Sequence, residues 1–112
     1  MNTQNPGVTT ADVEANIKHQ YFFTAADGVT LGNQPVASQL HLLTFCVLVT
    51  DNGHTITGEA HCQDPARFDA AIGRTEARKD AINKLWPMVV YAARDRLKPT
   101  DPEAATDTQD AS

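Results

Sequence analysis

The stretch LHLLTFCVLVTDNGHTITGEAHC, residues Leu40–Cys62, decides the fold. Both of its ends are rich in the β-branched and apolar residues that are typical of strands. Asn52-Gly53 between them is the strongest short-range signal of a two-residue hairpin turn. The stretch therefore predicts two antiparallel strands, over Leu40–Thr50 and Thr55–Cys62.

A two-residue turn also predicts which face of the hairpin is buried. On one face, four large apolar residues of the first strand oppose apolar or small partners: Leu43, Phe45, Val47 and Val49 opposite Cys62, Ala60, Gly58 and Ile56. On the other face the pairs are more polar: Thr44, Cys46 and Leu48 opposite His61, Glu59 and Thr57. Because a slip of one residue exchanges the two faces of a strand, we expect the apolar set to form the core.

Helical signals begin directly after the hairpin. Asp64-Pro65 is typical of an N-cap followed by proline at the first helical position. It predicts a short helix that runs through Ile72 and breaks at Gly73.

A long helix is predicted from Arg74 to about Leu97. Its apolar stripe recurs at three- and four-residue steps, at Ala77, Ala81, Leu85, Met88 and Ala92. Pro87 lies inside it and lacks a backbone donor, so we expect it to kink the helix near Lys84 or restart it after Trp86.

The chain before the hairpin is less regular. Thr9 is a good N-cap and Asp12 stands near the positive helix end, which predicts a helix over Thr10–His19. Residues Ala26–Ser38 are punctuated by Gly, Asn and Pro and are expected to form a loop. A short third strand at Val29–Leu31 is an alternative, because a lone hairpin is marginally stable.

These elements predict an α+β fold. An N-terminal helix and an antiparallel hairpin, with room for a third short strand, would pack on a long, kinked C-terminal helix. We expect one domain over residues 9–98, a loose N-terminus over 1–8 and a disordered acidic tail over 99–112. Such a sheet leaves an open edge, with which a second copy could pair as a homodimer.

Charge is distributed unevenly along the chain. The net charge is −5, yet eight of the nine Lys and Arg residues lie in residues 67–98. Composition excludes collagen-like and disulfide-scaffold classes. The longest apolar run, Phe45–Val49, is too short to span a bilayer, and no leader marks the chain for secretion, so no membrane role is expected.

Two arginines stand out in the basic segment. Extending the apolar stripe backward from Ala81 by helical steps reaches Arg78 and then Arg74, near the start of the long helix. Two guanidinium groups there suit an anion or the carboxylate of a partner. The predicted anion- or partner-binding residues are Arg74, Arg78, Lys79, Lys84 and Trp86. Alternatively, the arginines pair internally with Asp69 or Glu76.

Cysteine and histidine offer few signs of chemistry. In the predicted register Cys46 and Cys62 point to opposite faces, so free thiols are expected. No metal-binding spacing is present, and neither a metal nor a cofactor is predicted. Cys46, His61 and Glu59 would share one hairpin face as a nominal thiol-enzyme set. A flat sheet face supplies no cleft and no oxyanion donors, so we expect no enzymatic activity.

A set of short motifs carries a family resemblance across Ile17–Leu97. The motifs are Leu43-Thr44-Phe45-Cys46-Val47, Asn52-Gly53, Thr57-Gly58-Glu59 with Cys62, Phe68-Asp69, Ile72-Gly73-Arg74, Ala77-Arg78 with Ala81, and Leu85-Trp86-Pro87 with Tyr91. Together they resemble the gp-forty-nine-like family of small tailed-phage and prophage proteins. The resemblance implies a phage origin and the host cytoplasm, and it supplies no catalytic residues. By analogy with small phage accessory proteins, it implies a host-takeover or counter-defence factor that binds and inhibits a host protein.

A second likeness concerns the start of the long helix. Gly73–Ala81 resembles the final helix of double-stranded-RNA-binding domains, in which basic residues grip phosphates. It implies, as the alternative function, a nucleic-acid or nucleotide binder that uses the basic face of this helix. Thr75 replaces one basic residue of that pattern, and the acidic remainder of the chain would repel a polyanion.

Overall fold

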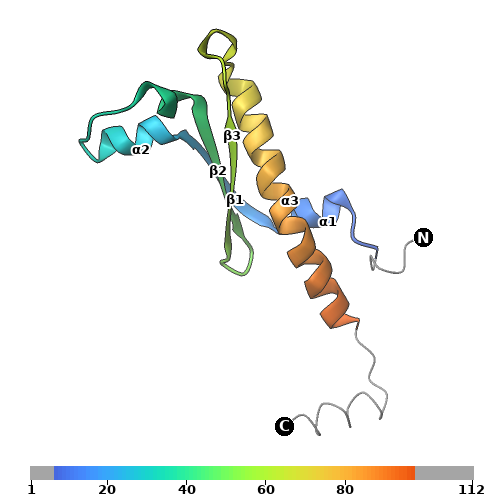
Figure 1. Cartoon of the computed structure of the whole chain (residues 1–112). Coiled ribbons are helices and arrows are strands. Elements are labelled where there is room, and N and C mark those ends of the chain that lie inside the picture. Colours follow the sequence, from blue (N-terminus) through green and yellow to red (C-terminus); the bar gives the residue numbers. More distant parts are fainter. Residues whose placement is uncertain (1–6, 98–112) are drawn as a thin grey trace, which may run out of the picture.

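The computed structural model describes residues 7–97, which form an α+β fold (Figure 1). In chain order, the elements are α1 (Thr10–Ala15), β1 (Ile17–Thr24), α2 (Ala25–Leu31), the 3-10 helix η1 (Ser38–Leu42), β2 (Leu43–Thr50), β3 (Thr55–His61), the 3-10 helix η2 (Pro65–Arg67) and α3 (Ala70–Arg96). The strands form one antiparallel sheet of order β1-β2-β3. The predicted acidic tail lies outside the described residues.

The long helix α3 covers one face of the sheet, which we call the inner face (Figure 1). The Asp69 side chain caps its start by accepting from the Ala71 and Ile72 amides, at 2.9 and 3.3 Å. Its buried stripe is Ala77, Ala81, Leu85, Val89 and Ala93. The predicted stripe is therefore right up to Leu85 and wrong beyond it, where Met88 and Ala92 are exposed.

Neither predicted interruption divides α3. Gly73 lies within its first turn, and the helix continues through Pro87, so the predicted break and restart are wrong. Asp64 caps a turn with proline at the first position, as predicted, but that turn is only the 3-10 helix Pro65–Arg67. The helix instead begins at Ala70, because Asp69 supplies the stronger cap with two amide contacts.

The hairpin forms where predicted, with a different turn. Three residues, Asp51, Asn52 and Gly53, connect the strands, and Gly53 adopts a left-handed φ of 86°. Its amide donates to the Thr50 carbonyl at 2.9 Å, and the Thr50 amide donates to His54. This is the three-residue arrangement, a tight turn followed by a left-handed glycine, rather than the two-residue turn.

The extra turn residue shifts the register by one and reverses the predicted face of β2. Cys46 now opposes Gly58 and Leu48 opposes Ile56, on the inner face. Cys46 and Leu48 are fully buried, whereas Phe45 and Val47 point to the opposite, outer face. The predicted core face is therefore right for β3 and wrong for β2.

Gly58 allows α3 to lie unusually close to β3. A Cβ at Gly58 would collide with the Ala77 carbonyl oxygen and the Ala81 amide nitrogen, and would lie 2.8 Å from the Ala81 Cβ. The small side chains of Ala77 and Ala81 complete this contact, and both are fully buried. Glycine is required here by close backbone approach.

The third strand comes from the N-terminal region, not from Val29–Leu31. Helix α1 ends at Ala15, four residues earlier than predicted, and β1 takes the aromatic-rich residues Ile17–Thr24. The Thr24 hydroxyl and the Asp27 carboxylate then form a capping box. That box starts α2 over part of the predicted loop, including the residues considered for a strand. Val8, expected in a loose terminus, is buried in the core.

Candidate functional site

The structure does not gather the five predicted site residues into one site. Arg78 faces α1 and β1, whereas Lys84 reaches the backbone of β3. Trp86 is half-buried and packs against the core cluster. Although these residues are close together along α3, they therefore lie in three different surroundings.

Arg78 joins three elements. Its guanidinium donates to both carboxylate oxygens of Glu14 on α1, at 2.8 and 2.5 Å. Its Nε donates to the Gln20 side chain of β1 at 2.8 Å. The bonds between Arg78 and Glu14 raise the pKa of Arg78 and lower the pKa of Glu14. The expected internal pairing of this arginine is present, although its partner is Glu14 rather than Asp69 or Glu76.

Replacing Glu14 by glutamine is expected to reduce the free energy of unfolding at pH 7 by about 1 kcal/mol, because the side chain is 41% exposed and solvent screens the pair. The folded-state pKa of Glu14 lies below its unfolded value. The stabilisation is therefore present above the unfolded pKa and is lost as pH falls through the folded pKa. Urea denaturation of wild type and Glu14→Gln at pH 7 and pH 3 measures it, and the difference should shrink at pH 3.

Glu76→Gln is the matched control. Glu76 forms an exposed ion pair with Lys79 at 3.2 Å within one helix, and its loss should cost less than about 0.5 kcal/mol. A Glu14→Gln difference that stays constant between the two pH values would contradict the assignment.

The remaining basic residues differ in whether their side chains have an ion-pair partner. Lys79 pairs with Glu76. Arg74 is exposed, and its side chain has neither a hydrogen bond nor an ion pair among residues 7–97. Anion binding by Arg74 together with Arg78 stays a prediction, and it would require Arg78 to exchange Glu14 for the anion.

Asp80 and Lys84 cover the free edge of β3, a role that the sequence did not suggest. The Glu59 amide donates to the Asp80 carboxylate at 2.9 Å, and Lys84 Nζ donates to the Thr57 carbonyl at 3.0 Å. The two side chains also form an ion pair at 3.2 Å. The Glu59 amide and Lys84 lower the pKa of Asp80. These contacts satisfy backbone groups that an edge strand would otherwise expose.

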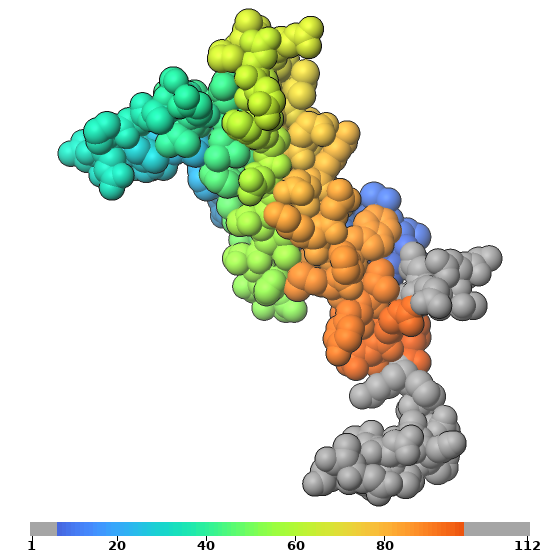
Figure 2. Space-filling model, in the orientation of Figure 1, coloured from blue at the N-terminus to red at the C-terminus, as the bar shows by residue number. Residues whose placement is uncertain are grey.

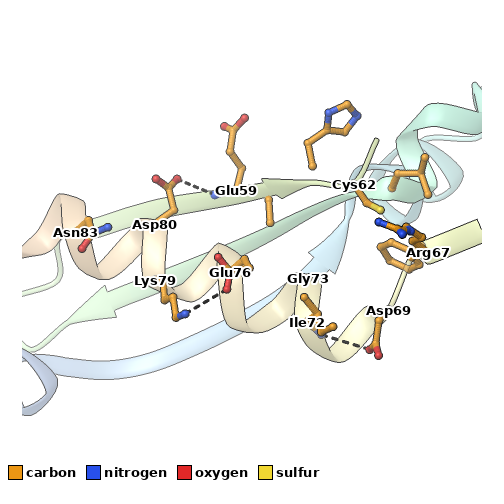
Figure 3. A pocket seen from close by; sticks show the side chains of 14 residues that line it. Glu59, Cys62, Arg67, Asp69, Ile72, Gly73, Glu76, Lys79, Asp80 and Asn83 are labelled. Atoms are coloured by element: carbon orange, nitrogen blue, oxygen red, sulfur yellow. Dashed lines mark hydrogen bonds and ion pairs between the residues drawn. The ribbon is translucent and has the colours of Figure 1, made fainter. Parts of the chain in front are cut away.

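An open groove of about 580 Å³ lies between β3, η2 and the first turns of α3 (Figure 3). Most of its charged groups already have partners: Asp69 caps α3, Lys79 holds Glu76 and Asp80 holds the Glu59 amide. The Cys62 thiol donates to the Asp64 carbonyl at 3.2 Å. The groove therefore presents largely satisfied side chains rather than a set poised for chemistry.

The nominal thiol-enzyme set is not assembled. Cys46 is fully buried on the inner face, where burial raises the pKa of its thiol. His61 and Glu59 are exposed residues of β3 that point to the outer face. Cys46 and Cys62 are both free. The predicted reason is wrong, however, because the shifted register places the two residues on the same face of the hairpin rather than on opposite faces.

No metal site or membrane span appears in the described part of the chain. Within residues 7–97, no group of three or more His, Cys, Asp or Glu side chains could hold a metal ion. None of the helices described there combines the length and the apolar character needed to cross a bilayer.

Among residues 7–97, the outer face of the sheet presents apolar side chains that no helix covers. Its central strand presents Leu43, Phe45, Val47 and Val49, all partly exposed. From β1, Tyr21 and Phe23 are 55% and 40% exposed. The rings of Phe23 and Phe45 contact each other with centroids 5.6 Å apart.

The surroundings of the outer face leave it accessible. α1 and α3 pack on the inner face. The arm made by α2 and η1 stands away from the sheet at one end (Figures 1 and 2). Polar residues flank the apolar centre on β3, at Thr55, Thr57 and Glu59. An apolar centre with a polar rim is the usual anatomy of a protein interface.

Comparison with known proteins places the chain in a family. Residues 8–97, nearly all of the described chain, match the model of the phage protein (N4 Gp49/phage Sf6 gene 66) family. No curated protein and no solved structure shows significant similarity to the chain. The match confirms the resemblance carried by the hairpin and long-helix motifs. The chain belongs to the phage protein (N4 Gp49/phage Sf6 gene 66) family.

Proposed function

We propose that this phage protein is a non-enzymatic binding protein that attaches to a host protein through the outer face of its sheet and inhibits it, as a host-takeover or counter-defence factor in the host cytoplasm. The observation that carries the proposal is the apolar face centred on Phe45 and Val47, which neither α1 nor α3 covers. Soluble monomers rarely leave a contiguous apolar surface exposed without a partner for it.

The chemistry of the face specifies the partner. Tyr21, Phe23 and Phe45 supply aromatic anchors, which carry much of the binding energy in protein interfaces. Charged residues are few at its centre and begin at its margin, with Glu59. The partner is therefore a protein with a complementary apolar patch rather than a polyanion.

The alternative, nucleic-acid or nucleotide binding by α3, has less support. Arg78, Lys79 and Lys84 each hold an internal carboxylate, so a phosphate would have to compete for them. Of the predicted basic residues, only Arg74 has no such partner within residues 7–97.

The test is capture from host extract followed by binding measurements with the purified partner. Replacing both Phe23 and Val47 by lysine should weaken binding at least about 100-fold, because two anchors at the centre of the interface are lost. Tyr91→Lys is the matched control, since Tyr91 is 74% exposed on α3, away from the sheet face. It should bind as wild type does, and circular dichroism should show that both variants are folded.

Three outcomes would contradict the proposal. One is a partner that binds the Phe23/Val47 double variant and wild type equally. Another is the absence of any captured protein across several hosts. The third is duplex RNA or nucleotide binding that falls steeply with salt and is lost in Arg74→Ala, which would favour the alternative function.

A further inference from the structure

The register of the sheet shows which backbone groups of β1 face away from it. The Thr50 amide donates to the His54 carbonyl, and the Cys62 amide donates to the Leu42 carbonyl. The even-numbered residues of β2 therefore direct their backbone amides and carbonyls toward β3, and the odd-numbered residues direct theirs toward β1. On β1, the odd-numbered partners of β2 are His19, Tyr21 and Phe23. In an antiparallel ladder, the intervening residues direct both backbone groups outward.

Gln20 and Phe22 therefore present two amides and two carbonyls at the free edge of β1. Thr24 has the same outward orientation, as shown by its amide, which donates to the Asp27 carboxylate at 2.8 Å. Within residues 7–97, none of the four groups of Gln20 and Phe22 has a hydrogen-bond partner.

The two edges of the sheet are thus treated differently. On β3, Asp80 and Lys84 occupy the outward Glu59 amide and Thr57 carbonyl. On β1, no side chain does the same for Gln20 and Phe22. Natural sheets usually cover an edge that must not pair, so the uncovered edge is the one available for strand addition.

We propose that a second copy of this chain adds its β1 antiparallel to β1, about a twofold axis at Tyr21, so that two sheets become one of six strands. In this register Gln20 of each copy opposes Phe22 of the other. The four outward groups of one copy then meet the four of the second, in four reciprocal hydrogen bonds. A closed twofold contact of this kind stops at two copies, and Asp80 and Lys84 already occupy part of each far edge, on β3.

The side chains of β1 suit its own copy. Tyr21 would lie beside Tyr21 of the second copy, and His19 beside Phe23 of the second copy, as aromatic cross-strand pairs on the outer face. Lys18, which lies at the bulge near the start of β1, would come close to Thr24 of the second copy, next to the Asp27 carboxylate that caps α2. Lys18 itself has no ion pair within residues 7–97, so the pairing brings opposite charges together.

The dimer is independent of the proposed host contact, because it uses the backbone edge rather than the apolar face. It would join two outer faces side by side into one surface. A dimer without host binding, or host binding by a monomer, would separate the two proposals.

Disulfide trapping tests the register. In a Cys62→Ser background, Tyr21→Cys should form an interchain disulfide on mild oxidation, because residues at the axis form a non-hydrogen-bonded pair with close Cβ atoms. Thr57→Cys is the control at the other edge, exposed on β3. In the dimer its two copies lie five strand spacings apart, about 24 Å, and should not cross-link.

Sedimentation of the full chain without added cysteine tests the assembly itself. Wild type is expected to be a dimer and Gln20→Pro a monomer, because proline removes an outward amide without disturbing the ladder to β2. Gln20→Ala controls for the lost Arg78 contact, keeps the amide and should remain a dimer. Monomeric wild type at high concentration overturns the proposal, and so does equal cross-linking of Tyr21→Cys and Thr57→Cys.

Discussion

Replacing Gly58 by valine is expected to lower the free energy of unfolding by at least about 3 kcal/mol, the upper end of what overpacking usually costs. The new Cβ would meet backbone atoms of Ala77 and Ala81, which cannot rotate away as a side chain could. Relief would require α3 to move off β3, exposing the buried stripe of the helix. For a domain of this size the melting temperature should fall by more than about 10 °C, measured by calorimetry.

Gly28→Ala is the matched control. Gly28 lies inside α2, where an added Cβ meets nothing within 4 Å. Alanine is the better helix former and restricts the unfolded chain, so this variant should be neutral or more stable by up to about 1 kcal/mol. A Gly58→Val variant that melts with wild type would mean that α3 does not lie against β3 at this point.

Leu48→Ala should cost about 3 kcal/mol, because Leu48 is fully buried between the sheet and α3 and its loss leaves a cavity. Val47→Ala, one residue away on the outer face, should cost about 1 kcal/mol or less, since Val47 is only partly buried. Urea denaturation of both variants compares the two faces of β2 directly.

The comparison also tests the hairpin register. A two-residue Asn52-Gly53 turn would bury Val47 and leave Leu48 on the other face. In that case Val47→Ala would lower the free energy of unfolding more than Leu48→Ala does. Equal losses would indicate that both faces of β2 are covered, and would count against an open outer face.

The long helix is the element that the sequence predicted best. Ala77, Ala81 and Leu85 repeat at four-residue steps, and that period is set by the helix itself. Beyond Leu85 the sequence predicted Met88 and Ala92, whereas the helix buries Val89 and Ala93. The positions of the sheet edge and of α1, which no local signal contains, determine that Val89 and Ala93 are buried instead.

The N-terminal region was predicted less well because its signals are short. Six residues suffice for α1, and its apolar contribution is the single buried Val13. Ile17–Thr24 does not alternate between apolar and polar residues, and it forms a strand by pairing with β2. Thr24 and Asp27 did carry a readable signal, a threonine followed three residues later by an acidic residue, which marked the start of α2.

The candidate site was likewise predicted only in part from the sequence. The sequence singled out Arg78, because an arginine on an apolar stripe is unusual. Its partners, Glu14 and Gln20, are 64 and 58 residues away along the chain. Likewise, nothing local to Asp80 and Lys84 showed that they would cover the edge of β3.

By itself, the sequence determined the α+β class, the hairpin, the long helix and membership of a phage family, because periodicity and turn residues act over a few positions. Only the tertiary structure decided which face of β2 is buried. One additional residue in the Asp51–Gly53 turn moved Phe45 and Val47 from the core to the surface, because strand side chains alternate with a period of two. It also decided that β1 is the open edge, since edge protection depends on which distant side chains reach the backbone.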